Sequence, residues 1–464
     1  MFNRFAWLAA CSSLCVVSFA CSDDDTNSSD DAATVADAGR TDPSPNQQQA
    51  GSEAKPTKAD ETTLPIVFVH GFAGSAQQFQ SQGMRFVANG YPAERLHAYE
   101  HDGAGAAGPD FVSGLDAVVD EARSKFKTEK VYLIGHSRGT SVSSMYLSES
   151  ARADKVAKYI ALDGAGCANI SVPCIAPAQS TNMRAGQTHP LPNQKHVEVA
   201  TSKESFAVQY EFLFDRAPEV VDIVKQSTPV VISGRAVNFP ANTGRDGATL
   251  EIWEVASDTG LRSGDKALAT IELGADGNWG PVTVSPDKHY EAVLKSKDTP
   301  NQHHFYAQPF LRSSPFVRFL SGPPESDSRK NTNTGDRHTA LNAMRQREWT
   351  TDDELKVRTR SKSGDQDERQ VITAEITNNP ISIFLHDDAA TPGESSLKLL
   401  PWFPQQPFQN GVDVYMPGND EPDGTVQLIN LPRGAKDKPQ TLNVPNWAST
   451  RHSVTVMFSD FPQD

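Results

Sequence analysis

The sequence predicts an α/β domain built on a mostly parallel sheet, followed by an all-β C-terminal region of sandwich or barrel-like type. In the first part, strand-like apolar runs alternate with helical stretches, which is the pattern of a parallel sheet covered on both faces. The helical stretch 109–126 carries apolar residues at helical spacing. Beyond about residue 228 the pattern changes to short alternating runs with Gly-rich turns, which is typical of β-sandwiches.

The 464 residues divide into segments with distinct patterns: a signal peptide (1–21), a disordered tether (22–60), the α/β domain (61–225), a β-sandwich module (228–320) and a second β-rich module (321–464). Strands are expected in the α/β domain at 65–70, 95–99, 131–136, 156–162 and 172–176. Strands are expected in the β modules at 230–239, 248–254, 267–273, 280–284, 290–294, 371–376, 381–385, 412–416, 425–431 and 453–458. Residues 321–370 are polar and predict no clear element.

The first residues have the pattern of an export signal. Arg4 supplies a positive charge, and the apolar stretch Phe5–Ala20 is too short for an ordinary membrane span. Ser18-Phe19-Ala20-Cys21 resembles a bacterial lipobox, so we expect cleavage before Cys21 and attachment of lipid to it; simple cleavage and release is the alternative. The expected product is an exported protein, either a cell-envelope lipoprotein tethered to the membrane through Cys21 or a secreted protein.

Charge excludes two kinds of partner. The formal net charge is −15, and in residues 22–60 nine acidic residues stand against three basic ones. Nucleic-acid binding needs clustered Lys and Arg for phosphate contacts, so no nucleic-acid partner is expected. The same acidity argues against adsorption to anionic membranes by charge. The segment 22–60 also lacks apolar periodicity and is rich in Asp, Ser, Thr, Pro and Gln, which predicts a flexible tether.

A G-x-S-x-G motif places Ser137 between a strand and a helix. Gly135-His136-Ser137-Arg138-Gly139 follows the apolar run Val131–Ile134, and residues 138–148 can continue as a helix. This strand–turn–helix arrangement is the nucleophile elbow of α/β-hydrolases, in which the turn lifts a serine hydroxyl above the sheet edge. Ser137 is therefore the predicted nucleophile.

A second turn supplies the other half of an expected oxyanion hole. The apolar strand ending at Val69 leads into His70-Gly71-Phe72, where this fold places a backbone N–H beside the nucleophile. We assign the two oxyanion donors to the backbone N–H groups of Phe72 and Arg138. His70 is expected to pack locally within the turn and to take no part in proton transfer.

The acid and the base must follow the serine in chain order. The histidines available before residue 228 are His189 and His196. His196 lies on a loop just ahead of the last core helix and is favoured as the base. His189, within Thr188-His189-Pro190, has the pattern of an extended surface segment.

The candidates for the acid lie mainly between the elbow and the base. Asp154 ends a helix, where a solvated charge is the ordinary explanation, and Glu149 and Glu198 are weaker candidates. Asp163 closes the strand 156–162 at its carboxyl end, where open α/β sheets build their sites, and is favoured. Its role would be to hold the imidazole tautomer and stabilise the imidazolium; capping of the next turn is the alternative.

The same segments resemble the serine lipases and carboxylesterases of the α/β-hydrolase class, in particular the family of the Archaeoglobus lipase. The resemblance is carried by VFVHGFAGSAQQFQSQGMRFVANG (67–90), LIGHSRGT (133–140), Leu162-Asp163-Gly164 and residues 196–212, with weaker similarity at 232–294 and 446–458. It implies a triad of Ser137, Asp163 and His196, a carboxylester substrate and a β-rich C-terminal domain that engages lipid. Two features depart from the family: His101–Gly114 stands where a longer lid is usual, and Arg138 stands where Met is usual.

Removal of the leader and lipidation of Cys21 leave Cys167 and Cys174 as the remaining cysteines. An exported compartment favours their pairing as a disulfide. The two residues bracket the loop just after Asp163, so the disulfide is expected to hold the loop of the acid.

No metal or other cofactor is expected. His303-His304 and His386-Asp387-Asp388 lack a second ligand pair at a recognisable spacing, and we expect them to be exposed loop residues. Trp402, Phe403 and Phe408 are candidates for an apolar contact surface for lipid, although core packing is the favoured explanation.

The sequence thus predicts a serine hydrolase that cleaves carboxylic esters, a triacylglycerol lipase or carboxylesterase with an acyl ester or lipid as substrate. Serine at the elbow disfavours epoxide hydrolases and dehalogenases, which use Asp there. One alternative changes the substrate to a polyester or a soluble ester. The other alternative is a lipid-binding surface protein with a vestigial hydrolase domain. The sequence does not predict an oligomeric state.

Overall fold

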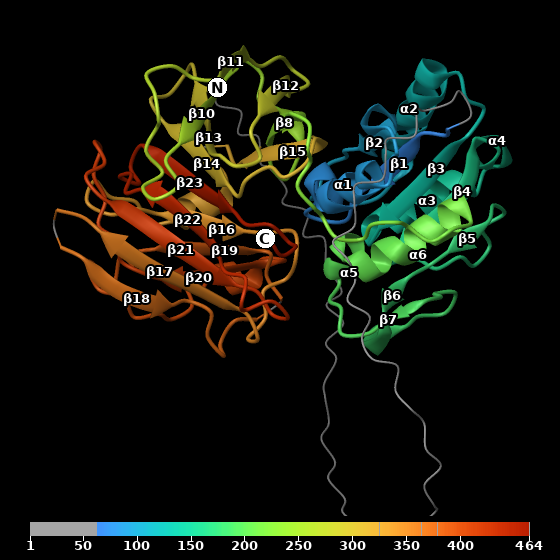
Figure 1. Ribbon diagram of the computed structural model, residues 1–464. Helices are drawn as coiled ribbons and strands as arrows, with labels where there is room; N and C mark the ends of the chain where they lie inside the picture. The colour runs from blue at the N-terminus through green and yellow to red at the C-terminus, as the bar shows by residue number, and fades with distance from the viewer. Residues whose placement is uncertain (1–62, 324, 363, 378, 464) are drawn as a thin grey trace, which may run out of the picture. The chain divides into compact units, whose positions relative to one another are not determined.

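The α/β part of the molecule is built on a five-stranded parallel sheet in the order β2-β1-β3-β4-β5 (Figure 1). The computed structural model describes residues 63–463 except 324, 363 and 378, and these residues belong to one compact unit. The expected signal peptide, Cys21 and the tether lie outside the described residues. The strands are β1 (Ile66–Val69), β2 (Leu96–Tyr99), β3 (Val131–His136), β4 (Val156–Leu162) and β5 (Cys174–Ile175).

Helices cover both faces of this sheet because its strands carry apolar side chains on each side. The helices are α1 (Gln80–Ala88), α2 (Pro109–Phe126), α3 (Arg138–Leu147), α4 (Ser150–Ala153), α5 (Glu198–Thr201) and α6 (Lys203–Phe214). Ile66 and Phe68 of β1 pack with α1 and α6, whereas Val67 and Val69 pack with α2 and α3. The shorter elements are the single turns η1 (Ala76–Phe79), η2 (Ala93–Arg95) and η3 (Ser180–Asn182) and the paired strands β6 (Ala178–Gln179) and β7 (Pro190–Leu191).

The helix α2 has the bounds that its periodicity predicts. Pro109 is its first residue, where the missing N–H of proline costs no helical hydrogen bond. The helix ends before Lys127, which adopts a left-handed conformation with φ 54°. No helix of the described chain is long and apolar enough to cross a membrane.

One eight-stranded sheet runs through the whole β region. Its order is β11 (Ala269–Glu272), β10 (Ala248–Val255), β13 (His289–Ser296), β14 (Gln302–Ala307), β23 (His452–Met457), β16 (Leu341–Met344), β19 (Ser382–His386) and β20 (Gln409–Asp413). The strand β23 pairs in parallel with β14 on one side and with β16 on the other. It therefore joins strands that come from the two expected β modules.

Two smaller sheets cover the two halves of the eight-stranded sheet. One consists of β12 (Asn278–Val284), β8 (Val230–Asn238) and β15 (Ser314–Ser321), with β9 (Thr243–Gly244) paired to β8; the other consists of β18 (Gln366–Gln370), β17 (Glu354–Arg360), β21 (Thr425–Leu431) and β22 (Gln440–Pro445). Each encloses a core with its half of the large sheet. The fold class predicted from the sequence, an α/β domain followed by a β-rich region, is confirmed, with two sandwiches built on one shared sheet.

Each core of the β region contains residues from both expected modules. Met344 and Met457 belong to the core that is formed mainly by residues 230–319. Val255 and Tyr306 belong to the other core. The boundary between two β modules at 320/321 stays a prediction, because residues from both segments pack into the same two cores.

One strand expected in the second module is wrong. Val371 and Ile372 are buried in the core, but residues 371–376 form no strand because the chain turns, with the N–H of Ile376 donating to Thr373 O at 3.2 Å. Several strands were not predicted, namely β14, β15, β16, β17, β18 and β22. In β17 the buried residues alternate with the half-buried charged residues Lys356 and Arg358, which give the segment its polar composition.

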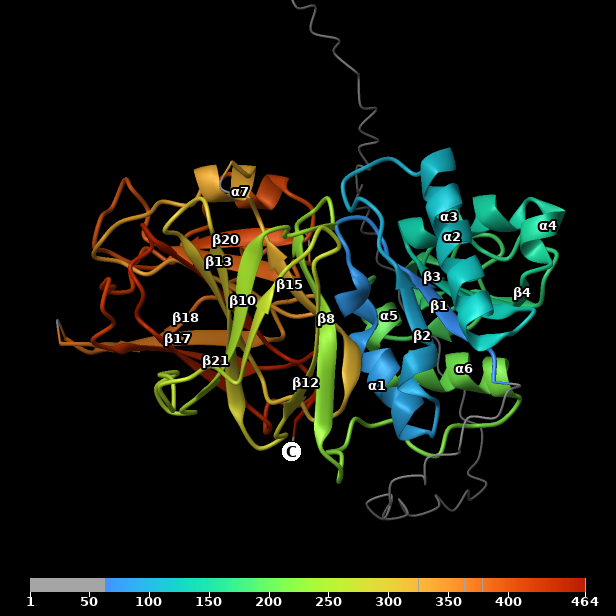
Figure 2. The same cartoon turned by 90° about the horizontal axis from the view of Figure 1, so that it is seen from above.

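The β region meets the α/β part at β15, which contacts α1 and η1, and β8 lies next to β15 at this border (Figure 2). Phe316 of β15 packs edge-on against Phe68 of β1, with ring centroids 5.6 Å apart. The Glu100 carboxylate, just after β2, pairs with Arg235 of β8 at 2.8 Å and with Arg318 of β15 at 2.9 Å. This contact fixes the β region next to the carboxyl edge of the parallel sheet.

Candidate active site

Ser137 lies at the tip of the turn between β3 and α3. Its backbone has φ 53° and ψ −123°, a strained conformation that is expected at a nucleophile elbow. Two glycines make the turn possible: a Cβ on Gly139 would lie 2.1 Å from Val69 O, and one on Gly135 would lie 2.9 Å from Gly139 O. The G-x-S-x-G spacing is therefore explained by steric crowding around the serine.

The His196 imidazole lies between Ser137 and Asp163. Its Nε2 accepts the Ser137 hydroxyl at 2.8 Å, and its Nδ1–H donates to Asp163 Oδ2 at 2.6 Å. Asp163 directly follows β4, and His196 lies on the loop before α5. The structure brings together the three side chains that the sequence selects. His189 and Asp154 are exposed and lie outside this hydrogen-bonded group.

The Asp163 carboxylate is largely buried and accepts hydrogen bonds from Gln179 as well as from the imidazole. Gln179 of β6 donates its backbone N–H to Oδ1 and its side-chain amide to Oδ2, both at 3.1 Å. Burial opposes ionisation of Asp163, but the hydrogen bond and charge of His196 outweigh burial, so the pKa of Asp163 lies below its usual value. The ionised carboxylate holds His196 in the tautomer whose Nε2 can accept a proton.

His136, the last residue of β3, holds the backbone of His196. Its Nε2–H donates to the backbone carbonyl of His196 at 2.9 Å, and the two rings lie 4.7 Å apart. Burial and then the electrostatic effect of the neighbouring His196 lower the pKa of His136 to about 3, so the His136 ring is neutral. The sequence motifs did not predict that His136 would bind the His196 backbone. The one feature that could have pointed to it is the position of His136 directly before Ser137.

The turn after β1 lies against Ser137. A Cβ on Gly71 would lie 2.9 Å from Ser137 Cβ, so this turn touches the serine. Within the described residues, no group accepts a hydrogen bond from the backbone N–H of Phe72 or of Arg138. Arg138 is the first residue of α3, where N–H groups have no partner within the helix. Both expected oxyanion donors are therefore available to a developing negative charge.

Comparison with known proteins assigns families to three stretches of the chain. The family model described as serine aminopeptidase, S33, matches residues 60–209. The lipase C-terminal domain model matches residues 228–324. The chain is an α/β-hydrolase with a lipase-type C-terminal domain. A third family model, a C-terminal domain, matches residues 327–462 of this hydrolase.

Individual relatives of the hydrolase are distant. A serine hydrolase-like protein of Danio rerio is 24% identical over 300 residues, which cover 60% of this chain and 87% of that protein. Bacillus licheniformis lipase BlEst2 in its propeptide form is 12% identical with a TM-score of 0.27, and the match covers 85% of this chain and 95% of the lipase. An extracellular α/β-hydrolase from a Paenibacillus species is 19% identical with a TM-score of 0.17; the match covers 22% of this chain and 41% of that one, about two fifths of its length. The assignment therefore depends on the family models.

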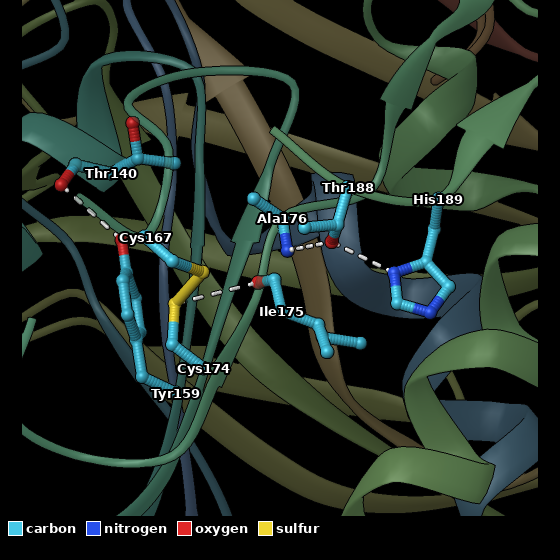
Figure 3. The surroundings of a disulfide bond; sticks show 8 residues. All are labelled: Thr140, Tyr159, Cys167, Cys174, Ile175, Ala176, Thr188 and His189. Atoms are coloured by element: carbon cyan, nitrogen blue, oxygen red, sulfur yellow. Dashed lines mark hydrogen bonds between the residues drawn. A yellow bond between two sulfur atoms is a disulfide. The ribbon is translucent and has the colours of Figure 1, made fainter. Parts of the chain in front are cut away.

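A disulfide closes the loop that follows Asp163 in the hydrolase domain. Cys167 and Cys174 are bonded, with Cα atoms 5.8 Å apart (Figure 3). Nearby, the Tyr159 hydroxyl donates to Thr140 O at 3.3 Å, and the Thr140 hydroxyl donates to Ser137 O at 2.6 Å. These bonds connect β4, which leads to Asp163, with the helix that follows Ser137.

The Arg138 side chain binds the short loop that stands where a lid is usual. It donates to Asp102 O at 2.7 Å and to His101 Nδ1 at 3.1 Å. Its guanidinium lies over the Phe72 ring, 5.2 Å from the ring centroid. The residue that departs from the family therefore holds this loop through its side chain, and its backbone N–H stays free.

The β region also contacts the turn after β1 in the hydrolase domain. His70 stacks on His101 with ring centroids 3.9 Å apart, and its Nδ1–H donates to Gly71 O at 2.8 Å. Burial and then the charge of His101 lower the pKa of His70 to about 3, so the ring is neutral and packs within the turn. The Asn242 side chain donates to Gly74 O at 2.9 Å and to His101 O at 3.0 Å.

A cavity of about 620 Å³ lies beside the site, between the turn after β1 and the β region. Phe72 contributes to its wall from the hydrolase domain. From the β region its apolar wall includes Phe239, Leu320, Leu341, Met344, Trp402 and Phe408. The Phe408 ring stacks on the His196 ring with centroids 6.2 Å apart, so one wall reaches the site. Phe403, in contrast, is fully buried. Of the three aromatic residues considered for lipid contact, Trp402 and Phe408 therefore line the cavity and Phe403 packs in the core.

Two histidine clusters expected on exposed loops lie inside the β region, so that expectation is wrong. His304 on β14 is fully buried and hydrogen-bonds Glu291 at 2.6 Å and His452 at 2.8 Å. His386 and Asp387, at the end of β19, are also buried. Burial of His304 is possible because both ring nitrogens are paired. In the part of the chain that the structure describes, no group of three or more His, Cys, Asp or Glu is arranged to hold a metal.

Proposed function

We propose that this hydrolase cleaves carboxylic esters, with Ser137 as nucleophile, His196 as general base and Asp163 as the group that orients the base. The observation that carries the proposal is the imidazole between the other two side chains, 2.8 Å from Ser137 Oγ and 2.6 Å from Asp163 Oδ2. A nucleophile, a base and an orienting carboxylate linked in this order activate a serine for acyl transfer. The serine hydrolase-like relative supports the same chemistry.

The proposed reaction has two acyl-transfer steps. Ser137 Oγ attacks the ester carbonyl carbon while its proton passes to His196 Nε2, and the oxyanion accepts the N–H groups of Phe72 and Arg138. The tetrahedral intermediate collapses, and the alcohol leaves with the proton from His196, which gives an acyl ester on Ser137. Water then attacks this ester, loses its proton to His196, and releases the carboxylic acid as Ser137 Oγ regains the proton. No cofactor enters the scheme.

The cavity supports a substrate with a long apolar acyl chain. Its volume of about 620 Å³ is within the range of small-molecule sites, and its wall includes several large apolar side chains. The lipase C-terminal domain model covers the segment that supplies Phe239 and Leu320. We therefore favour acyl lipids such as triacylglycerol over soluble esters or polyesters.

A fluorophosphonate probe tests the nucleophile, and a series of p-nitrophenyl esters tests the substrate. We expect the probe to label the wild-type protein and to leave Ser137→Ala unlabelled. We expect kcat/KM to rise with acyl chain length and emulsified triglyceride to be hydrolysed. Absence of labelling in folded wild-type protein would contradict the hydrolase proposal and favour a lipid-binding function. A preference for the shortest ester would favour a soluble-ester substrate.

We also propose that the protein is exported and anchored in the cell envelope through lipid on Cys21. The disulfide between Cys167 and Cys174 supports an oxidising compartment. Metabolic labelling with palmitate should mark the wild-type protein and fail to mark Cys21→Ser. Release of unlabelled wild-type protein into the medium would indicate simple secretion.

A further inference from the structure

A loop of the β region reaches the backbone that carries His196. Glu348, between β16 and β17, is fully buried. One carboxylate oxygen accepts the backbone N–H of Glu198 at 3.1 Å, and the other accepts the backbone N–H of Val197. Val197 and Glu198 are the two residues that directly follow His196. The Glu348 carboxylate therefore binds the short stretch of backbone that carries the imidazole.

Glu348 is itself held in place by arginines. Arg345 and Arg433 donate to its backbone carbonyl at 2.8 and 2.6 Å. The Glu198 side chain pairs with Arg433 at 2.7 Å and with Arg347 at 2.8 Å. The stretch after His196 is therefore attached to the β region through its N–H groups and through one side chain.

We infer that Glu348 is a positioning residue for His196: its carboxylate fixes the backbone that carries the imidazole and places a negative charge near the imidazolium that forms during the reaction. This inference depends on the proposed function, because it concerns the base of that reaction. Asp163 binds Nδ1 of the ring, His136 binds the carbonyl of His196, and Glu348 binds the next two N–H groups. The base is held from three directions, one of them supplied by the β region.

The neighbouring arginines pair with other carboxylates, so the Glu348 carboxylate hydrogen-bonds the N–H groups of Val197 and Glu198. His196 and Glu198 act on the carboxylate electrostatically, Arg345 and Arg433 bind the backbone carbonyl of Glu348, and Arg347 pairs with Glu198. The three arginines pair with Glu198 and Asp353, and among the described residues none forms an ion pair with the Glu348 carboxylate. Burial raises the pKa of Glu348 above its usual value, and the hydrogen bond from the Val197 N–H and then His196 oppose this effect only in part.

Two substitutions of Glu348 separate the effect of its charge from the effect of its side-chain length. Glu348→Gln keeps the size and removes the charge, and Glu348→Asp keeps the charge and shortens the side chain. Asp460→Asn is the matched control, because Asp460 also reaches from the β region to the hydrolase domain, accepts the Ser81 hydroxyl of α1 at 2.6 Å and has a pKa raised by burial. The measurements are kcat and KM on a short ester, the pH profile of kcat/KM, and the rate of phosphonylation by a fluorophosphonate.

For Glu348→Gln we expect kcat to fall about tenfold, with KM for the short ester unchanged. The acidic limb of the profile reports protonation of His196. It should move to lower pH by roughly half a unit, because the imidazolium loses a nearby negative charge. Glu348→Asp should lower kcat and keep the acidic limb of the wild type. Asp460→Asn should change neither quantity.

A Glu348→Gln protein with the kcat and acidic limb of the wild type overturns the inference. Equal changes in Asp460→Asn also overturn it, since they would indicate a general weakening of the contact between the β region and the hydrolase domain. If Glu348→Gln does not fold, wild-type kcat in Glu348→Asp is the refuting result. Phosphonylation distinguishes this from failure of the ester proposal: labelling without ester turnover refutes the substrate, and the labelling rates still report on Glu348.

Discussion

The ion pairs of Glu100 link the α/β part to the β region, and their contribution to the free energy of unfolding can be measured. Its carboxylate is 3% exposed and accepts Arg235 at 2.8 Å, Arg318 at 2.9 Å and the backbone N–H of Ala76 at 2.8 Å. Burial alone would raise the pKa of Glu100, but Arg318 and then Arg235 outweigh burial and lower it from 4.5 to about 2. Substitution of Glu100 by Gln should remove most of the stabilisation that this difference represents.

The magnitude follows from the difference in pKa between the unfolded and folded states. A pKa that falls from 4.5 to about 2 on folding corresponds to about 3 kcal/mol of folding free energy. The folded-state pKa is the lower one, so this stabilisation is fully present above about pH 4.5 and is lost as the pH falls toward 2. We therefore expect Glu100→Gln to be about 3 kcal/mol less stable at neutral pH, and the difference from the wild type to shrink on acidification.

Urea unfolding of both proteins at several pH values from about 7 down to about 3 measures this effect. Glu354→Gln is the control, because Glu354 forms an exposed pair with Lys436 at 3.0 Å, and its loss should cost less than about 1 kcal/mol. A Glu100→Gln protein as stable as the wild type at neutral pH would refute the reasoning. A destabilisation that is the same at every pH would refute it as well.

Three further substitutions test other parts of the site. Ser137→Ala should lower ester turnover by about 10⁴-fold or more in a protein that circular dichroism shows to be folded, and near-wild-type turnover would contradict its role. Gly71→Ala should reduce kcat by at least about tenfold, because the added Cβ would lie 2.9 Å from Ser137 Cβ. Its control is Gly264→Ala, where an added Cβ meets nothing within 4 Å, and equal rates in the two variants would exclude the steric explanation. Replacement of both Cys167 and Cys174 by Ser should cost about 2.5 kcal/mol of unfolding free energy on the chain-entropy model, since the bridged positions are only 7 apart. An unchanged urea midpoint would contradict that estimate.

Features that depend on local pattern could be predicted from the sequence. The apolar spacing of 109–126 is sufficient for α2, since a helix needs only its own residues to set its buried face. Ser137 is recognisable because the glycines on both sides are required by the close approach of the neighbouring backbone. Chain order and position at a strand end were enough to select Asp163 and His196, which the structure places within hydrogen-bonding distance of each other.

Features that depend on pairing of polar groups across the fold could not be predicted. Glu348 lies 150 positions from Glu198, and nothing in its neighbourhood distinguishes it from a surface carboxylate. The segment 321–370 looks polar for the same reason, although Arg345 and Asp353 form a fully buried ion pair at 2.7 Å. Their burial is stable because each charge meets its partner, and the partner is known only once the chain is folded.

The place of β23 in the large sheet has a consequence for biosynthesis. It lies between β14 and β16, yet translation produces it after both of them and after the strands β17 to β22. Until β23 is available to pair, the facing edges of β14 and β16 stay open, and such edges invite pairing with other unfolded chains. The framework that carries the Glu348 loop is therefore completed only at a late point in synthesis, and a chaperone that covers open strand edges would help most during that interval.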